Sequence, residues 1–184
     1  FGDAPTPRTR WHAVTIEADG FVLRPTTEAD LPRWAEAESS PAARHWFDQG
    51  EQSVEVIEAR WRRSILAEAR GTFVRWTIAD AEDRYLGGVS LFGIEHGSAE
   101  VGYFLHPDAT GRGIMTRAVE AAADWAFSSE GLDVHRVSLD VADGNAASMA
   151  VARRAGFVAC GRRSRSEPLG DGTLADLLEY ERLR

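Results

Sequence analysis

Lysine is missing from this 184-residue sequence, because all 21 residues counted as lysine or arginine are arginines. Nucleoside-triphosphate P-loops place a lysine directly after their last glycine, where it reaches the phosphates. The absence of lysine therefore argues against a P-loop nucleotide site. Cysteine occurs once, at Cys160, which rules out an internal disulfide and indicates a reducing compartment. The apolar residues before it predict a strand in which Cys160 is a buried thiol rather than a nucleophile.

Long apolar runs are missing as well. No run approaches the length that spans a bilayer, and the N-terminus lacks the apolar core of a secretory signal peptide. The first residue is not methionine, so we expect a sequence that was trimmed or is shown in part. Together these absences predict a cytoplasmic protein with no membrane partner.

An excess of positive charge is the third absence. The formal net charge is -8 at pH 7, which argues against a broad nucleic-acid surface and suits a cationic or amine substrate. The five histidines do not have the spacing of metal ligands, so we expect no metal.

What is present indicates one globular domain. The hydrophobic fraction of 43% and six tryptophans are typical of a chain that buries a proper core. We interpret residues 1–15 as a loose N-terminal lead-in and residues 16–184 as the single domain.

Hydrophobic spacing predicts the secondary structure in order. Phe21–Pro25 is expected as a short strand, followed by helices over 26–39 and 53–71 with a loop over 40–52. The second helix is expected to pack through one face, made of Val54, Ile57, Trp61 and Ile65.

The period then changes to that of strands. An antiparallel meander is expected over 72–80, 84–94 and 98–107. A helix over 112–130, a strand over 134–143 and a short helix over 145–156 follow, before two final strands over 157–166 and 174–183. This order predicts a mixed α/β domain.

A glycine-containing loop opens the helix in "HPDATGRGIMTRAVEAAADWAF", His106 to Phe127. Gly111 and Gly113 let the backbone bend and approach a ligand, and the free N–H groups of the helix start favour an anion. A dinucleotide fingerprint is incomplete, because Thr116 fills its third glycine position and a meander precedes the loop. From these residues alone, a phosphate site and a helix start without a ligand both remain open.

The segments "AEVGYFLHPDATGRGIMTRAVEAAADWAF" and "VSLDVADGNAASMAVARRAGF" together resemble the GNAT superfamily of acyl-CoA-dependent N-acetyltransferases. The resemblance is greatest to the RimJ/RimL branch of ribosomal-protein alanine N-acetyltransferases, and it extends from Phe21 to the last strand. It implies a single-domain GNAT fold of the α/β class: a mixed, mostly antiparallel sheet with splayed central parallel strands, flanked by helices. The implied reaction moves an acetyl or other short acyl group from a CoA thioester to a primary amine by direct attack in a ternary complex.

The resemblance also implies which residues bind acetyl-CoA, the cosubstrate. The loop would hold the CoA pyrophosphate, the strand before it and the later Asn would contact the pantetheine arm, and the residues concerned are Tyr103, Phe104, Leu105, Gly111, Arg112, Gly113, Ile114, Met115, Thr116 and Asn145. Two positions depart from the usual loop: Thr110 stands where Arg or Gln is usual, and Met115 where Gly or Ala is usual. The backbone donors and Arg112 remain.

Catalytic roles follow from the same resemblance. The N–H near Leu105 is expected to stabilise the oxyanion, Glu100 to act as the base and Ser148 to protonate the leaving thiolate. In a regular strand Glu100 and Leu105 lie on opposite faces, and a bulge between them would reverse this. Each assignment has a structural alternative: Glu100 orders water or pairs with an arginine, whereas Asn145 is a helix N-cap and Ser148 lies one turn later on the same face.

The identity of the acceptor is left open. A protein N-terminus or a small molecule would serve as the amine, and a homodimer is an alternative to a monomer. Trp46 and Phe47 either line the acceptor pocket or only pack. The competing hypothesis for the whole protein is a GNAT-like domain that binds acyl-CoA without turnover, as a sensor or scaffold.

Overall fold

A computed structural model describes residues 12–47 and 50–184 of the chain. Most of the expected lead-in therefore lies outside the described residues. Within them, one mixed sheet has the strand order β1-β2-β3-β4-β5-β6-β8-β7. The strands are β1 (Ile16–Ala18), β2 (Phe21–Pro25), β3 (Phe73–Ala79), β4 (Tyr85–Glu95), β5 (Ser98–Leu105), β6 (Arg136–Ala142), β7 (Val158–Pro168) and β8 (Leu174–Leu183).

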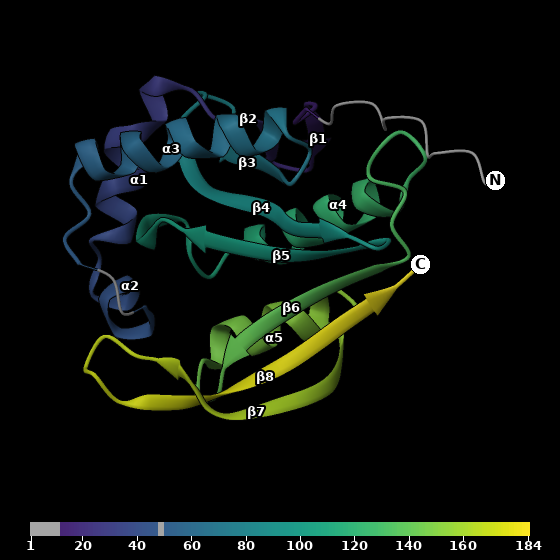
Figure 1. The fold of residues 1–184 in the computed structure, drawn as a ribbon. Helices are drawn as coiled ribbons and strands as arrows, with labels where there is room; N and C mark the ends of the chain where they lie inside the picture. The colour runs from purple at the N-terminus through teal and green to yellow at the C-terminus, as the bar shows by residue number, and fades with distance from the viewer. Residues whose placement is uncertain (1–11, 48–49) are drawn as a thin grey trace.

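The sheet opens at its centre, between β5 and β6. The meander β3-β4-β5 is antiparallel, as predicted, and β5 pairs with β6 in parallel over only three residue pairs, from Ser98–Arg136 to Glu100–Ser138. Beyond Glu100 the two strands diverge toward α2 (Pro41–Trp46), and Figure 1 shows the resulting gap between the ribbons. The expected splayed parallel pair is thus present.

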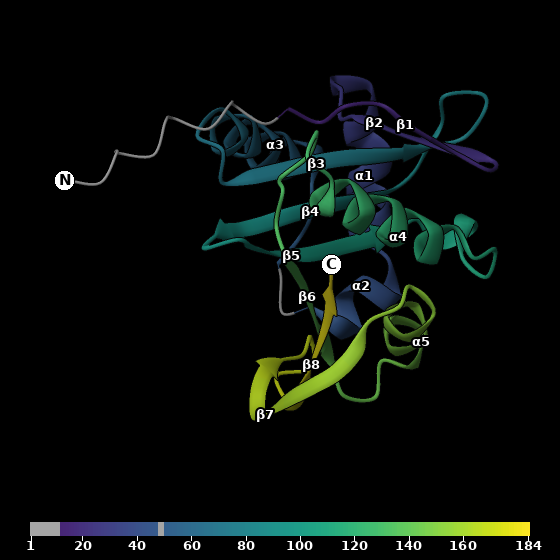
Figure 2. The same cartoon turned by 90° about the vertical axis from the view of Figure 1, so that its right-hand side faces the viewer.

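Helices cover both faces of the sheet. α1 (Leu31–Glu38) and α3 (Val54–Ala69) pack over β3 and β4, where Leu31, Trp34 and Ile57 form a small core. On the other face lie α4 (Ile114–Phe127) and α5 (Ala146–Arg154), which contact each other and are seen side by side in Figure 2. The larger core fills the space under α4.

Several sequence-based expectations were wrong. Residues 41–46, expected as a loop, form α2, because the side chain of Ser40 accepts the N–H of Ala43 and Pro41 occupies the first turn. Strand β1 was not foreseen. Of the expected face of α3, Ile57 is buried and Trp61 packs against the same core, whereas Val54 and Ile65 are exposed. Cys160 is exposed as well, because it lies on β7 at the edge of the sheet.

Helix α2 is held against the far end of the sheet. The turn between β7 and β8 reaches it, where the N–H of Gly170 donates to the carbonyl of His45 at 3.1 Å. A side chain at Gly170 would collide with the carbonyl of Arg44, so this close approach requires glycine. The contact joins the two halves of the open sheet and positions the end of α2.

A buried carboxylate ties the start of α1 to the sheet. Asp30 is 3% exposed and accepts two hydrogen bonds from Arg24 of β2, at 2.8 and 2.9 Å, and one from the Thr77 hydroxyl of β3 at 3.1 Å. Burial by itself raises the pKa of Asp30, but the hydrogen bonds from Arg24 and the Thr27 N–H outweigh it and leave that pKa lowered.

Two substitutions around Arg24 should separate the buried partner from the exposed one. We expect Asp30→Asn to lower the free energy of unfolding by about 3 kcal/mol, because it leaves Arg24 without its buried counter-charge. Asp83→Asn removes a partner whose side chain is 75% exposed, and should cost less than about 1 kcal/mol. Denaturant unfolding measures both, and equal losses would contradict the assignment.

The same carboxylate should shape stability in acid. Because its folded pKa is lowered, Asp30 contributes stability above the ordinary aspartate pKa of about 3.9, and this contribution is lost as the pH falls through the folded value. The difference in stability between wild type and Asp30→Asn should therefore shrink in acid.

Candidate active site

The backbone of β5 is unpaired on one side where it faces the gap. The N–H of His106 donates to the carbonyl of Leu86 at 2.7 Å, which sets the alternation along the antiparallel pair with β4. That alternation directs the N–H groups of Tyr103 and Leu105 away from β4. Since pairing with β6 stops at Glu100, both groups point into the gap. They are free donors for a ligand that lies along the strand.

The side chains of β5 alternate without interruption. The register with β4 is continuous from Phe92–Glu100 to Gly87–Leu105, so no bulge separates Glu100 from Leu105. Tyr103 and Leu105 pack on the core under α4, whereas Phe104 packs on the core of α1 and α3. Glu100 therefore lies on the opposite face from Leu105, as a regular strand requires.

The glycine loop adopts the conformation that its residues allow. Gly111 and Gly113 have φ of 74° and 69°, in the left-handed region, and Gly113 precedes the first turn of α4. α4 accordingly begins at Ile114, two residues later than expected. A Cβ at either glycine would meet open space, so the backbone angle, rather than crowding, requires glycine. The first N–H groups of α4 have no helical acceptor.

The two unusual loop residues have local roles. The hydroxyl of Thr110 donates to the carbonyl of Pro107 at 2.8 Å and so closes the turn before the loop. Met115 is 5% exposed and belongs to the larger core. Neither adds a long polar side chain to the loop.

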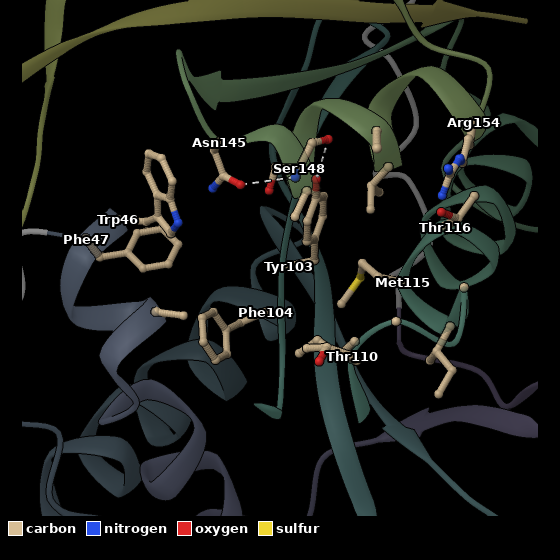
Figure 3. A pocket seen from close by; sticks show the side chains of 18 residues that line it. Trp46, Phe47, Tyr103, Phe104, Thr110, Met115, Thr116, Asn145, Ser148 and Arg154 are labelled. Atoms are coloured by element: carbon tan, nitrogen blue, oxygen red, sulfur yellow. Dashed lines mark hydrogen bonds between the residues drawn. The ribbon is translucent and has the colours of Figure 1, made fainter. Parts of the chain in front are cut away.

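A cavity of 320 Å³ lies between the loop, β5 and α5, and we call it the α4–α5 cavity (Figure 3). It collects the expected CoA-binding residues apart from Arg112, which is exposed, and it also contains Ser148. Its lining is Ala42, Trp46, Phe47, Tyr103, Phe104, Leu105, Thr110, Gly111, Gly113, Ile114, Met115, Thr116, Asn145, Ala147, Ser148, Ala150, Val151 and Arg154. Helices α2 and α5, whose nearest ends are 100 positions apart in the sequence, thus line the same cavity.

The start of α5 is fixed by two contacts. The side-chain oxygen of Asn145 accepts the N–H of Ser148 at 3.1 Å, so the expected N-cap is present. Its amide nitrogen is turned away from the helix, toward Trp46 (Figure 3). The Tyr103 hydroxyl donates to the carbonyl of Ser148 at 3.4 Å, and burial raises the pKa of Tyr103 to about 12. Tyr103 is therefore protonated at neutral pH.

A second cavity, of 540 Å³, adjoins the first and contains Glu100. We call it the acidic cavity, because Asp140 of β6 and Glu167 of β7 also line it, with Arg163 as the basic residue. The two cavities share a wall made of Trp46, Phe47, Tyr103, Asn145 and Ser148. The two cavities therefore adjoin beside the free edge of β5.

The carboxyl groups of the acidic cavity hold protons more readily than usual. Burial raises the pKa of Glu100, the negative charge of Asp140 raises it further, and Arg163 opposes both. Burial likewise raises the pKa of Asp140, although Arg163 pairs with this carboxylate. Glu100 is thus placed in surroundings that make it a better proton acceptor than an exposed glutamate.

Sequence reasoning missed several lining residues. On α5, Ala147, Val151 and Arg154 reach the α4–α5 cavity, and their spacing of three to four positions is a signal that was available. Asp140 and Arg163 reach the acidic cavity from β6 and β7. No local pattern indicates them, because strand pairing across the sheet places them there.

Two general findings limit the kinds of site. Among residues 12–47 and 50–184, no cluster of three or more His, Cys, Asp or Glu side chains is arranged to hold a metal ion. No helix in this part of the chain combines the length and the apolar character needed to cross a membrane.

Comparison with known proteins identifies the family. Residues 21–158 match the family model of the acetyltransferase (GNAT) domain. This chain belongs to the GNAT acetyltransferase family. The solved structure of RimL, the ribosomal L7/L12 alpha-N-protein acetyltransferase in complex with coenzyme A, is similar to this GNAT domain with a TM-score of 0.82. It is 26% identical and the match covers 92% of this chain and 98% of that one.

Curated relatives match over shorter stretches. The probable N-acetyltransferase YjcK of Bacillus subtilis is 42% identical over 80 residues, which are 42% of this chain and 43% of YjcK. The spermidine N(1)-acetyltransferase of Vibrio cholerae is 29% identical over 116 residues, 62% of this chain and 64% of that enzyme. The GNAT domain thus matches less than two thirds of the length of either relative.

Opposite changes at two neighbours of Glu100 should move its pKa in opposite directions. Asp140→Asn removes a like charge and should lower the pKa of Glu100, whereas Arg163→Gln removes an opposing charge and should raise it. A shift of about one unit either way is the expected scale for one nearby charge. NMR titration of the labelled Glu100 carboxyl measures both. Shifts in the same direction would contradict these charge effects, and no shift in either variant would show that burial alone sets this pKa.

Proposed function

We propose that this GNAT domain is an acetyl-CoA-dependent N-acetyltransferase that moves an acetyl or other short acyl group to a primary amine. The observation that carries the proposal is the position of β5. Its free N–H groups at Tyr103 and Leu105 lie in the gap, with the α4–α5 cavity on one side and the acidic cavity on the other. A donor and an acceptor can therefore be bound at once, which favours direct attack in a ternary complex.

The α4–α5 cavity suits coenzyme A by the chemistry of its lining. The glycine loop and the open first turn of α4 offer backbone donors to a pyrophosphate, and the free edge of β5 offers donors and acceptors to an amide-containing arm. The similar RimL structure contains coenzyme A. The residues that would hold it are Tyr103, Phe104, Leu105, the loop and first turn from Gly111 to Thr116, and Asn145. When bound, acetyl-CoA supplies an acyl group activated as a thioester.

The chain's own groups then account for the proton and charge movements. The Leu105 N–H donates to the carbonyl oxygen where negative charge develops. Glu100, on the acceptor side, takes the proton that the amine must lose, directly or through water. The Ser148 hydroxyl, in the wall common to both cavities, donates a hydrogen bond to the departing sulfur.

The acceptor is a primary amine on a small molecule or at a protein N-terminus. The residues of the proposed site come from one chain, and we assign them to one domain over 16–184. A homodimer stays an expectation that the proposed chemistry does not require. A sensor that binds acyl-CoA without turnover would leave Glu100 and Ser148 without a chemical role.

Release of free thiol from acetyl-CoA in the presence of a panel of amines tests the proposal. We expect amine-dependent release, with kcat/KM rising as the pH passes through the raised pKa of Glu100, because only the carboxylate accepts a proton. Glu100→Gln should lower kcat at least about 100-fold with CoA affinity unchanged. Glu95→Gln, whose side chain is 75% exposed at the end of β4, is the matched control. Full activity of Glu100→Gln would refute its role as the base.

Asn145 and Ser148 should separate in binding and rate. Asn145→Asp keeps the N-cap but replaces the amide donor by a charge, so the loss of one hydrogen bond, about 0.5–1.5 kcal/mol, should weaken CoA binding up to tenfold. Ser148→Ala should lower kcat while CoA affinity and melting temperature stay close to wild type. Calorimetry and steady-state kinetics measure these effects. If both variants match wild type in both assays, α5 is structural only.

A further inference from the structure

Arg75 of β3 has a partly buried guanidinium group. It makes no ion pair with any residue in the described part of the chain, and its Nε is buried without a hydrogen-bond partner. Its guanidinium carbon lies 3.6 Å from the centre of the Trp34 ring, and burial lowers the pKa of Arg75. Stacking on Trp34 orients the group but does not neutralise it.

The neighbouring carboxylate is already engaged. Glu38 of α1 accepts the indole N–H of Trp34 at 2.5 Å with one oxygen, and it pairs with Arg60 through the other. A second carboxylate, Glu68 of α3, accepts the backbone N–H of Arg75 at 3.1 Å, but neither Glu38 nor Glu68 forms an ion pair with the Arg75 guanidinium. The buried hydroxyl of Tyr85 lies next to Arg75, and burial raises the pKa of this phenol.

Arg75 faces a cavity of 190 Å³, which we call the Arg75 cavity. Arg75 is in register with Ser90, which is in register with Gly102, so the three lie in one row on the same face of the sheet. All three line the cavity together with Phe104 and with Glu38, whose carboxylate is held by Trp34 and Arg60. Gly88 lines it too, and a side chain at Gly88 would collide with a terminal nitrogen of Arg75, so glycine leaves the guanidinium room to lie across β4.

The Arg75 cavity adjoins the acidic cavity. Phe47, Gly102 and Tyr103 line both. Glu100 lies two residues from Gly102 on the same face of β5, a separation of about 7 Å along the strand. The acceptor side of the proposed active site therefore presents carboxylates at one end and, at the other, the Arg75 guanidinium, which lies beside Glu38.

We propose that the acceptor is a primary amine that carries an anionic group, a carboxylate or a phosphate, a few bonds away, and that this group binds Arg75. The inference rests on the proposed acetyl transfer. A planar guanidinium binds carboxylate or phosphate through paired hydrogen bonds, and an anion in the cavity would be the ion-pair partner that Arg75 lacks among the described residues. The amine of the same molecule would then lie in the acidic cavity next to Glu100, because the Arg75 cavity adjoins the acidic cavity at Gly102.

Matched pairs of amines test this assignment. β-Alanine is compared with β-alaninamide, and phosphoethanolamine with ethanolamine, by kcat/KM in the thiol-release assay. Wild type should prefer at least one anionic member over its neutral counterpart at least about tenfold. Arg75→Met should abolish that preference and leave the KM for acetyl-CoA unchanged. The control is Arg62→Met, because Arg62 is exposed and pairs with Glu58 on the outside of α3, and it should retain the preference.

Gly88→Ala is a second variant that keeps the charge. Its methyl group should displace the flexible end of Arg75 rather than any backbone, so the protein should fold while the preference falls. A wild-type enzyme that acetylates both members of each pair equally, or a preference that survives Arg75→Met, would overturn the inference.

A binding measurement keeps this inference separate from the proposed function. Inorganic phosphate, compared with sodium chloride at equal ionic strength, should raise the melting temperature of wild type by more than that of Arg75→Met, because the glycine loop can bind phosphate in both proteins. If no amine is acetylated while this difference is observed, the acetyl transfer fails and the anion site at Arg75 stands. If amines are acetylated without any anionic preference and phosphate has no Arg75-dependent effect, the anion site fails and the acetyl transfer stands.

Discussion

The divergence of β5 from β6 is the constraint on which the rest of this structure depends. Parallel pairing stops after three residue pairs, at Glu100 and Ser138, and the strand continues to Leu105 without a partner on that side. Unpaired backbone groups inside a protein are costly unless water or a ligand satisfies them. The free edge of β5 is therefore the feature on which the proposed binding of a chain-like molecule depends, and the glycine loop that follows is the proposed anion site at its end.

The helical layer that contains α1 and α2 is joined to the opened sheet by contacts between distant segments. Asp30 joins the start of α1 to β2 and β3, and the carbonyl of His45 in α2 accepts from the β7–β8 turn. α2 thus bridges the two diverging halves, and Trp46 and Phe47 at its end reach both main cavities. These long-range contacts build the wall between the α4–α5 cavity and the acidic cavity, the proposed sites of the acyl donor and the amine acceptor.

Charge is distributed unevenly around β5. The α4–α5 cavity is lined mostly by small and apolar side chains, whereas the opposite face carries the Glu100 cluster and, beyond Gly102, Arg75. A net charge of -8 gives no hint of this local pattern, because the pattern depends on which side chains are brought out of water together. Partial burial affects both the proposed base and the proposed anion site, because it raises the pKa of Glu100 and lowers that of Arg75.

The sequence by itself determined the turns and helix starts that depend on residues a few positions apart. Gly111 and Gly113 mark a left-handed turn before a helix, and Asn145 with Ser148 marks a helix start, because backbone angles and N-caps are set within a few residues. The family resemblance added the prediction of a mixed sheet with splayed central parallel strands. Only the tertiary structure decided that Cys160 is exposed, that Asp140 and Arg163 line the acidic cavity, and that Arg75 lines the cavity next to it. Strand order and the burial of charges depend on pairing between distant segments, which no local spacing encodes.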